Sequence, residues 1–191
     1  MNVDTENQTA TMSDKRVLLI IGGGIAAYKS LELIRVLKKR GVASRCILTQ
    51  AGKQFVTPMS VAALSGDKVY DDLFSLTDEA QMGHIELSRS ADLVVVCPAT
   101  AHLMAKLAAG MADDLAATTL LATDTAILMA PAMNVRMWEH PATKRNVATL
   151  RGWGVEILEP DEGEMACGEY GPGRLAEVDR IAEAIIAALT P

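Results

Sequence analysis

The chain has few aromatic residues, no long apolar run and no large basic cluster. Aromatic side chains make up only 4% of its 191 residues although 50% are hydrophobic, so the core must consist of Val, Ile, Leu, Met and Ala. No basic cluster is larger than Lys38-Lys39-Arg40, and the net charge is −6. We expect no nucleic-acid partner, because nucleic-acid binding needs a basic face. We also expect no membrane partner, because no apolar run reaches the length that spans a bilayer.

The three cysteines lie in unrelated contexts, and no two of them form a CxxC pair. Cys46 and Cys97 each fall in an apolar segment that is typical of a buried strand. An odd number of unpaired cysteines predicts reduced thiols in a cytoplasmic protein, with neither a disulfide framework nor a metal site. Residues 1–14 are polar and lack the apolar segment of a signal peptide. We expect a disordered tail there, followed by one domain over residues 15–191.

Five short apolar segments alternate with helical patterns. The predicted strands are Arg16–Ile21, Ala43–Leu48, Asp92–Cys97, Ala126–Ala130 and Val155–Leu158, with Pro98 and Pro131 ending the third and fourth. The predicted helices are Ile25–Arg40, Pro58–Leu64, His84–Ser90, Ala101–Ala109, Pro141–Gly152 and Glu177–Leu189. Continuous apolar strands that alternate with helices predict an α/β fold with a parallel sheet and helices on both faces.

The loops that follow the carboxyl ends of these strands should form the site, because open parallel sheets bind ligands there. After the first strand, Gly22-Gly-Gly-Ile-Ala-Ala27 matches the G-x-G-x-x-A dinucleotide pattern. The second strand ends at Thr49 and Gln50, with no acidic residue for a ribose, which disfavours NAD. A mononucleotide with its phosphate on backbone N–H groups is favoured instead. A tight turn for helix packing would explain one or two of the three glycines.

Cys167 lies in the glycine-rich segment Met165-Ala-Cys-Gly-Glu-Tyr-Gly-Pro-Gly-Arg174. Three glycines and a proline predict a loop rather than a helix or a strand. A thiol on such a loop, within residues 161–175, is placed to meet a ligand. An ordinary loop cysteine explains the local sequence equally well, since the environment sets the reactivity of a thiol.

Four segments resemble the phosphopantothenoylcysteine decarboxylases, which belong to the homo-oligomeric flavin-containing cysteine decarboxylases. They are Gly23-Gly-Ile-Ala-Ala-Tyr-Lys29, Pro98-Ala-Thr-Ala-His-Leu-Met-Ala-Lys106, Pro131-Ala-Met-Asn-Val-Arg-Met137 and Ala166-Cys-Gly-Glu-Tyr-Gly-Pro-Gly-Arg174. The resemblance covers about residues 15–190. It implies a three-layer flavodoxin/Rossmann-like fold, FMN as cofactor, and homotrimers or a dodecamer of trimers. The implied reaction converts 4′-phospho-N-pantothenoylcysteine to 4′-phosphopantetheine and carbon dioxide in coenzyme A biosynthesis.

The resemblance implies catalytic roles for three residues. His84 matches the family's active-site histidine, which would act as a base or orient the substrate. Asn134 matches the residue that binds the substrate carboxylate, and an amide can donate to it without a countercharge. Cys167 matches the thiol that protonates the enethiolate after decarboxylation. Outside the four-motif match, packing or capping would explain His84, and turn formation would explain Asn134.

For the cofactor and the substrate, the resemblance points to residues of the same loops. The expected FMN-binding residues are Gly24, Ile25, Ala26, Thr49, Lys53, Phe55, Pro98, Ala99, Thr100, Ala101 and Ala132. Met137 and Arg174 are the expected substrate-binding residues beside Asn134, with Arg174 either meeting the substrate phosphate or pinning the loop. Lys53 is equally explained as a solvated residue. His102 stands where many members carry Asn, and we assign it no role.

Two other functions remain open. A non-catalytic FMN-binding regulatory relative would be free to lose His84, Asn134 or Cys167, yet all three are present. A flavin prenyltransferase shares the flavin loops but does not need Pro-Ala-Met-Asn together with a loop cysteine. Bacterial relatives often fuse this domain to a ligase, and the sequence leaves open whether the chain is a stand-alone enzyme or an excised domain.

Overall fold

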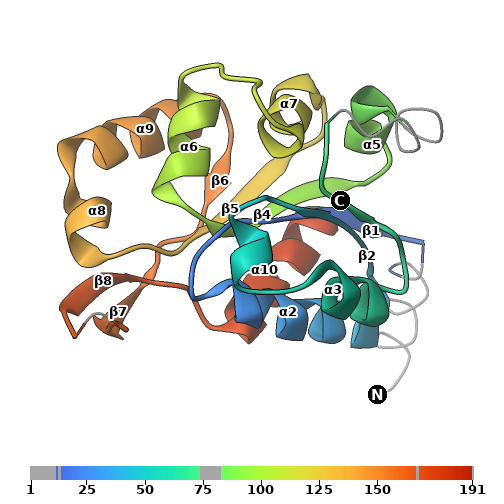
Figure 1. Ribbon diagram of the computed structural model, residues 1–191, viewed down its shortest axis with the longest axis horizontal. Coiled ribbons are helices and arrows are strands. Elements are labelled where there is room, and N and C mark those ends of the chain that lie inside the picture. Colours follow the sequence, from blue (N-terminus) through green and yellow to red (C-terminus); the bar gives the residue numbers. More distant parts are fainter. Residues whose placement is uncertain (1–11, 13, 74–82, 167, 191) are drawn as a thin grey trace.

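The computed structural model describes residue 12 and residues 14–73, 83–166 and 168–190; most of the expected tail therefore lies outside it. Within these residues, six parallel strands form one sheet in the order β3-β2-β1-β4-β5-β6 (Figure 1). In chain order the strands are β1 (Arg16–Ile21), β2 (Ala43–Leu48), β3 (Val69–Tyr70), β4 (Leu93–Ala99), β5 (Ile127–Pro131) and β6 (Glu156–Ile157). The predicted α/β fold is confirmed.

Helices cover both faces of the sheet. Alternate residues of each strand point to opposite sides, so both faces present apolar side chains that the helices bury. Val17, Leu19 and Ile21 of β1 pack on one side with α2 (Ala27–Lys39), α3 (Pro58–Ser65) and α10 (Val178–Leu189). Leu18 and Ile20 pack on the other side, most of whose helices appear above the sheet in Figure 1. These are α5 (His84–Arg89), α6 (Ala101–Ala108), α7 (Leu115–Ala122), α8 (Val135–Glu139) and α9 (Pro141–Gly152). None of the helices in the described ranges combines the length and apolar character needed to span a bilayer.

Two prolines do not end their strands as predicted. β4 runs through Pro98 to Ala99, and β5 includes Pro131. The register between β4 and β5 shifts between Val96 and Ala99 before Ala99 pairs with Pro131. Proline lacks an N–H donor, so a strand tolerates it at such an irregularity or at its end.

The glycine-rich segment predicted as a loop forms a second sheet instead. β7 (Asp161–Glu164) and β8 (Tyr170–Arg174) pair antiparallel as a hairpin (residues 161–174), which lies beside α8 at the lower left of Figure 1. The loop prediction is therefore wrong for these strands. A Cβ atom at Gly171 would lie 2.7 Å from Val135 Cγ2, and one at Gly173 would lie 2.4 Å from the Met133 carbonyl oxygen. Glycine here permits close packing of an extended chain rather than a turn.

Candidate functional site

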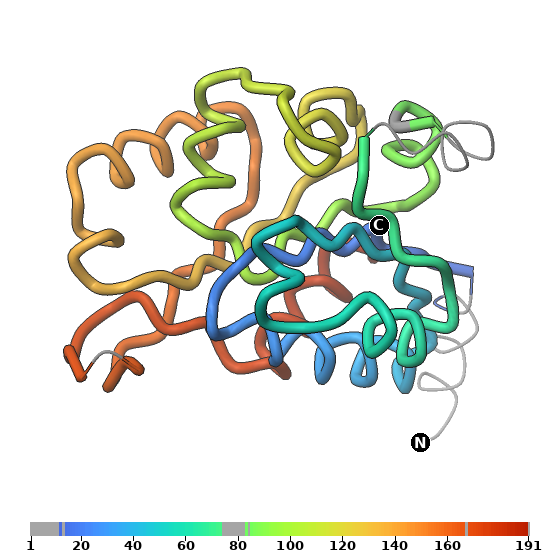
Figure 2. Tube along the Cα trace, viewed as in Figure 1, coloured from blue at the N-terminus to red at the C-terminus, as the bar shows by residue number. Residues whose placement is uncertain are grey.

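A cavity of about 900 Å³ opens where the strands of the large sheet end. Its walls come from the loops after β1, β2, β4 and β5 and from the hairpin, which Figure 2 shows passing beneath the chain after β5. This is the edge at which parallel α/β sheets bind ligands, as the sequence predicts. Ten of the predicted site residues line the cavity: Gly24, Ile25, Ala26, Thr49, Thr100, Ala101, Ala132, Asn134, Met137 and Arg174.

The glycine loop (Gly22–Ala26) forms the first wall. A Cβ atom at Gly22 would lie 2.3 Å from the Pro98 carbonyl oxygen, and one at Gly23 would lie 2.3 Å from Ala51 Cβ. Packing therefore requires these two glycines. Gly24 faces open space: among the described residues, apart from its two chain neighbours, no heavy atom lies within 4 Å of a Cβ there. Within the described ranges no side chain caps the first turn of α2, so this helix end suits a bound phosphate.

Two threonines order the neighbouring loops. The Thr49 hydroxyl donates to the Ile21 carbonyl oxygen at 2.9 Å and accepts from the Gly52 N–H at 3.0 Å. It thus ties the end of β1 to the short 3-10 helix η1 (Gly52–Gln54). The Thr100 hydroxyl accepts from the Leu103 N–H at 3.2 Å and caps α6. Both of these predicted FMN-binding residues line the cavity, and both also hold its wall in shape.

Four of the predicted FMN-binding residues are not among those that line the cavity. Lys53 Nζ lies 2.7 Å from the Asp71 carboxylate, and the Phe55 side chain is exposed outside the cavity wall. Pro98 and Ala99 belong to β4, where Ala99 is fully buried. The structure therefore places these four residues behind or beside the wall rather than on it.

Asn134 stands at the turn between β5 and α8. Its side-chain Oδ1 accepts from the Arg136 N–H at 2.7 Å and caps α8. Its Nδ2 donates to the Glu169 carboxylate on the hairpin. Because Oδ1 is held by the backbone, the amide presents N–H groups toward the hairpin side. The same side chain thus forms the turn and offers a donor for a carboxylate.

The hairpin forms the second wall and is joined to the Asn134 turn. The Met133 N–H donates to the Gly173 carbonyl oxygen at 2.9 Å, and the Val135 N–H lies 3.2 Å from the Met165 sulfur. Arg174 lines the cavity and lies 3.7 Å from the Glu177 carboxylate. Cys167, one of the predicted catalytic residues, lies outside the described residues. Its neighbour Ala166 lines the cavity.

His84, the third predicted catalytic residue, begins α5. Its side chain lies outside what the structure describes. Figure 1 shows α5 and the hairpin at opposite ends of the molecule, and none of residues 85–89 lines the cavity. One chain therefore does not bring α5 to the wall that holds Asn134.

The sequence interpretation missed an ion-pair group in the cavity wall. Lys106 of α6 has a side chain only 8% exposed, with Nζ 2.7 Å from Asp113 and 2.6 Å from Asp114. Burial lowers the pKa of Lys106, but hydrogen bonds to the two carboxylates outweigh it and raise that pKa overall. The hydrogen bond from Lys106 lowers the pKa of Asp113. Asp114 also caps α7, a helix that the sequence interpretation did not include. An acidic residue before an apolar run is the sequence signal that could have indicated its start.

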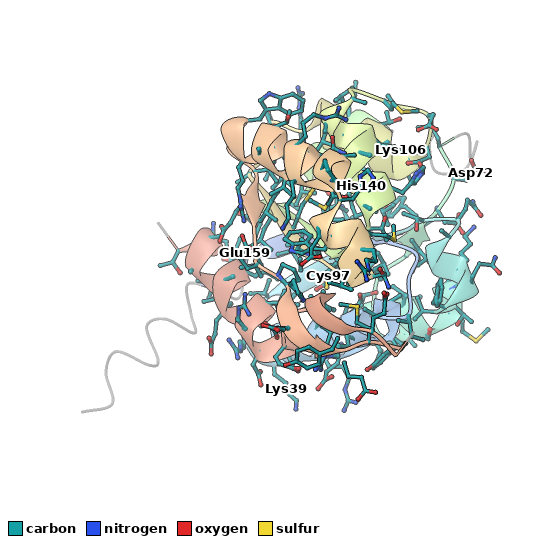
Figure 3. All side chains as sticks on the ribbon, turned by 90° about the vertical axis from the view of Figure 1, so that its left-hand side faces the viewer. Lys39, Asp72, Cys97, Lys106, His140 and Glu159 are labelled. Atoms are coloured by element: carbon teal, nitrogen blue, oxygen red, sulfur yellow. The ribbon has the colours of Figure 1, made fainter. Side chains whose placement is uncertain are left out.

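Two buried thiols lie away from the cavity. Burial raises the pKa of Cys46 and that of Cys97 to about 12, so both stay protonated at neutral pH. Figure 3 places Cys97 in the interior, and the Ser30 hydroxyl of α2 donates to its carbonyl oxygen at 2.7 Å. Within the described ranges, no three His, Cys, Asp or Glu side chains are grouped to hold a metal ion.

Comparisons with known proteins agree with this geometry. The flavoprotein family matches residues 5–190. The coenzyme A biosynthesis bifunctional protein CoaBC of Vibrio vulnificus is 50% identical over 167 residues, which cover 87% of this chain and 42% of that protein. The CoaBC protein of Escherichia coli is 45% identical over 181 residues, covering 95% of this chain and 45% of that protein. The chain thus spans less than half the length of these curated relatives.

Two solved structures share the fold. A PPC decarboxylase mutant complexed with pantothenoylaminoethenethiol has a TM-score of 0.78 at 30% identity, covering 90% of this chain and 96% of that one. The FMN-dependent cysteine decarboxylase SpaF has a TM-score of 0.77 at 31% identity, covering 93% and 98%. The family resemblance predicted from the four sequence motifs is confirmed, and the chain belongs to the flavoprotein family.

Proposed function

We propose that this chain catalyses the FMN-dependent decarboxylation of 4′-phospho-N-pantothenoylcysteine to 4′-phosphopantetheine and carbon dioxide. The observation that carries the proposal is the pairing of two walls around one cavity: an uncapped helix end on a glycine loop, and an amide donor at Asn134. The CoaBC relatives, named for coenzyme A biosynthesis, and the PPC decarboxylase neighbour support it.

The glycine-loop wall fits a flavin mononucleotide. Gly24, Ile25 and Ala26 at the start of α2 would hold its phosphate, because backbone N–H groups and the helix dipole favour an anion there. Thr49, Thr100, Ala101 and Ala132 would line the rest of its site. When bound, FMN would supply a two-electron oxidant for the cysteine moiety and return the electrons after decarboxylation.

The hairpin wall would bind the substrate. Asn134 would donate to the carboxylate that is lost; since its amide is neutral, it would orient this group without stabilising its charge as strongly as a cation would. Arg174 would meet the substrate phosphate, and Met137 would line the site. Cys167, next to the cavity-lining Ala166, would donate the proton that completes the product thiol.

The site would be completed by a second copy of the chain in a homotrimer or a dodecamer of trimers. Ile25 and Tyr28 both line the cavity, yet they are 63% and 57% exposed, an unusual state for large apolar residues at a ligand site. A catalytic role for His84 also needs α5 to reach a cavity, and the hairpin end of the same chain is distant from α5.

Two measurements on the purified protein test this function. We expect the protein to absorb as bound oxidised flavin, with FMN released on denaturation. Incubation with phosphopantothenoylcysteine should then give phosphopantetheine and carbon dioxide by mass spectrometry. A colourless protein that takes up no FMN would contradict the proposal. A yellow protein without turnover would favour a binding or regulatory role.

A further inference from the structure

A carboxylate of the protein already contacts the amide that would donate to the carboxylate of the proposed substrate. Glu169, in the hairpin connection, accepts a hydrogen bond from Asn134 Nδ2 through Oε2. Its Oε1 lies 3.4 Å from Arg136 Nε. Asn134 is the residue proposed to donate to the substrate carboxylate, so one amide faces two candidate acceptors of the same chemistry.

The fold holds Glu169 in this place. The Met165 N–H donates to the Glu169 carbonyl oxygen at 2.8 Å, and the Gly168 N–H donates to the Met165 carbonyl oxygen at 2.9 Å. These bonds make a tight turn at the end of the hairpin. The hydrogen bond from Met133 to Gly173 joins the hairpin to the Asn134 turn. The Glu169 side chain is 39% exposed, so it has room to leave the contact.

We infer that Glu169 sets the preference of the site between ligands with and without a carboxylate, because it competes with the substrate carboxylate for Asn134. Two carboxylates close together on one neutral amide repel each other, so binding of the substrate carboxylate displaces Glu169. Decarboxylation removes the carboxylate that occupies Asn134, and Glu169 then returns to the amide. The amide keeps a partner in the free and product-bound states, which avoids the cost of an unsatisfied donor. This inference rests on the proposed function.

The test compares two unreactive ligands that differ only in the carboxylate. Phosphopantothenoylserine carries the carboxylate but has a hydroxyl in place of the oxidisable thiol, whereas phosphopantothenoylethanolamine lacks the carboxylate. Their affinities are measured by calorimetry on the flavin-loaded protein. Glu169→Gln removes the charge at nearly constant shape. Glu162→Gln is the matched control, because Glu162 is an exposed carboxylate on β7 of the same hairpin and does not line the cavity.

We expect Glu169→Gln to bind the serine ligand about tenfold more tightly than the wild type, because a charged competitor becomes a weaker neutral one. Its affinity for the ethanolamine ligand should not change, and Glu162→Gln should match the wild type for both. Glu169→Ala removes the acceptor altogether and should give at least the same gain. It provides the test if the glutamine variant loses its flavin.

Three results would contradict the inference. Unchanged or weaker binding of the serine ligand by both Glu169 variants would mean that Glu169 only positions Asn134. An equal gain for both ligands would mean that the effect does not depend on the ligand carboxylate. If neither ligand binds the flavin-loaded wild type, the proposed substrate is wrong, and the inference falls with it.

Discussion

Both walls of the cavity contain close backbone contacts, but the connection between β7 and β8 in the hairpin wall is also held by side chains that are partly exposed. Gly22 and Gly23 leave no room for a methyl group beside Pro98 and Ala51. Glu169 and Arg136, which hold the hairpin connection, are 39% and 82% exposed. Close backbone contacts suit a resident cofactor, and the exchangeable polar contacts of the hairpin connection suit a substrate that arrives and leaves. Substitutions in one wall should therefore alter different properties from substitutions in the other.

The largest effect is expected from Gly23→Ala in the first wall. The new Cβ would lie 2.3 Å from Ala51 Cβ and 2.6 Å from the Ala51 carbonyl carbon, so backbone must move. We expect a loss of about 3 kcal/mol in the free energy of unfolding, together with loss of bound flavin. Urea unfolding followed by circular dichroism measures the first, and absorbance of the purified protein measures the second.

Gly24→Ala is the control for that prediction, because in the part of the chain that the structure describes no heavy atom beyond the two chain neighbours lies within 4 Å of the added Cβ. The flavin-free variant should have nearly the same urea midpoint of unfolding as the flavin-free wild type. Equal destabilisation by the two substitutions would contradict the assignment of Gly23 to packing and Gly24 to the open cavity.

In the second wall, Asn134→Asp should lower turnover without lowering stability by a comparable amount. Aspartate keeps the oxygen that caps α8 but replaces the amide donor with a charge that repels both the substrate carboxylate and Glu169. Loss of a single donor to a developing or lost charge typically costs about 100-fold or more in turnover. Product formation and flavin content are measured together, with Asn146→Asp on α9 as the control. Full turnover by Asn134→Asp would contradict the proposed role of Asn134 in binding the substrate carboxylate.

The same difference explains which parts of the molecule the sequence could predict. β1, β2 and α9 match their predicted bounds, because continuous apolar runs and capped helical patterns are local signals. The all-round apolar stretch Leu115–Ala122 has no stripe to mark α7. The hairpin was missed because its glycines resemble a loop, and their reason is contact with Val135 and Met133 from another part of the chain.

The site follows the same rule. The sequence predicts that Asn134 and Gly24 lie at the site because each belongs to a short motif after a strand, and both line the cavity. Lys106 and Glu169 also lie inside quoted motifs, but each of them acts through a partner outside its own motif. Lys53 and Phe55 show the converse, since a motif position alone did not place them on the cavity wall of this chain.

A smaller effect on stability should appear at high pH in the buried strand β4, whose Pro98 packs against Gly22 of the first wall. Burial raises the pKa of Cys97 from 9.0 to about 12, so the native state keeps a proton that the unfolded state loses. This contribution is complete below pH 9 and is lost as the pH rises toward 12. It should amount to about 1.4 kcal/mol between pH 8 and pH 10. Urea unfolding at both pH values should show a smaller decline for Cys97→Ala than for the wild type; identical declines would contradict the assigned pKa.

The smallest effect concerns the hydroxyl that joins β1 to η1. Thr49→Val keeps the shape of the side chain but removes a donor to the Ile21 carbonyl oxygen and an acceptor for the Gly52 N–H. We expect a loss of about 1 kcal/mol in the free energy of unfolding, with weaker flavin binding, because Gly52 and Ala51 would be held less firmly against Gly23. Thr49→Ser retains the hydroxyl and should keep both properties near wild type. If valine and serine reduce flavin affinity equally, methyl packing rather than the hydroxyl sets this wall, and the contrast with the hairpin wall would rest on the glycine contacts alone.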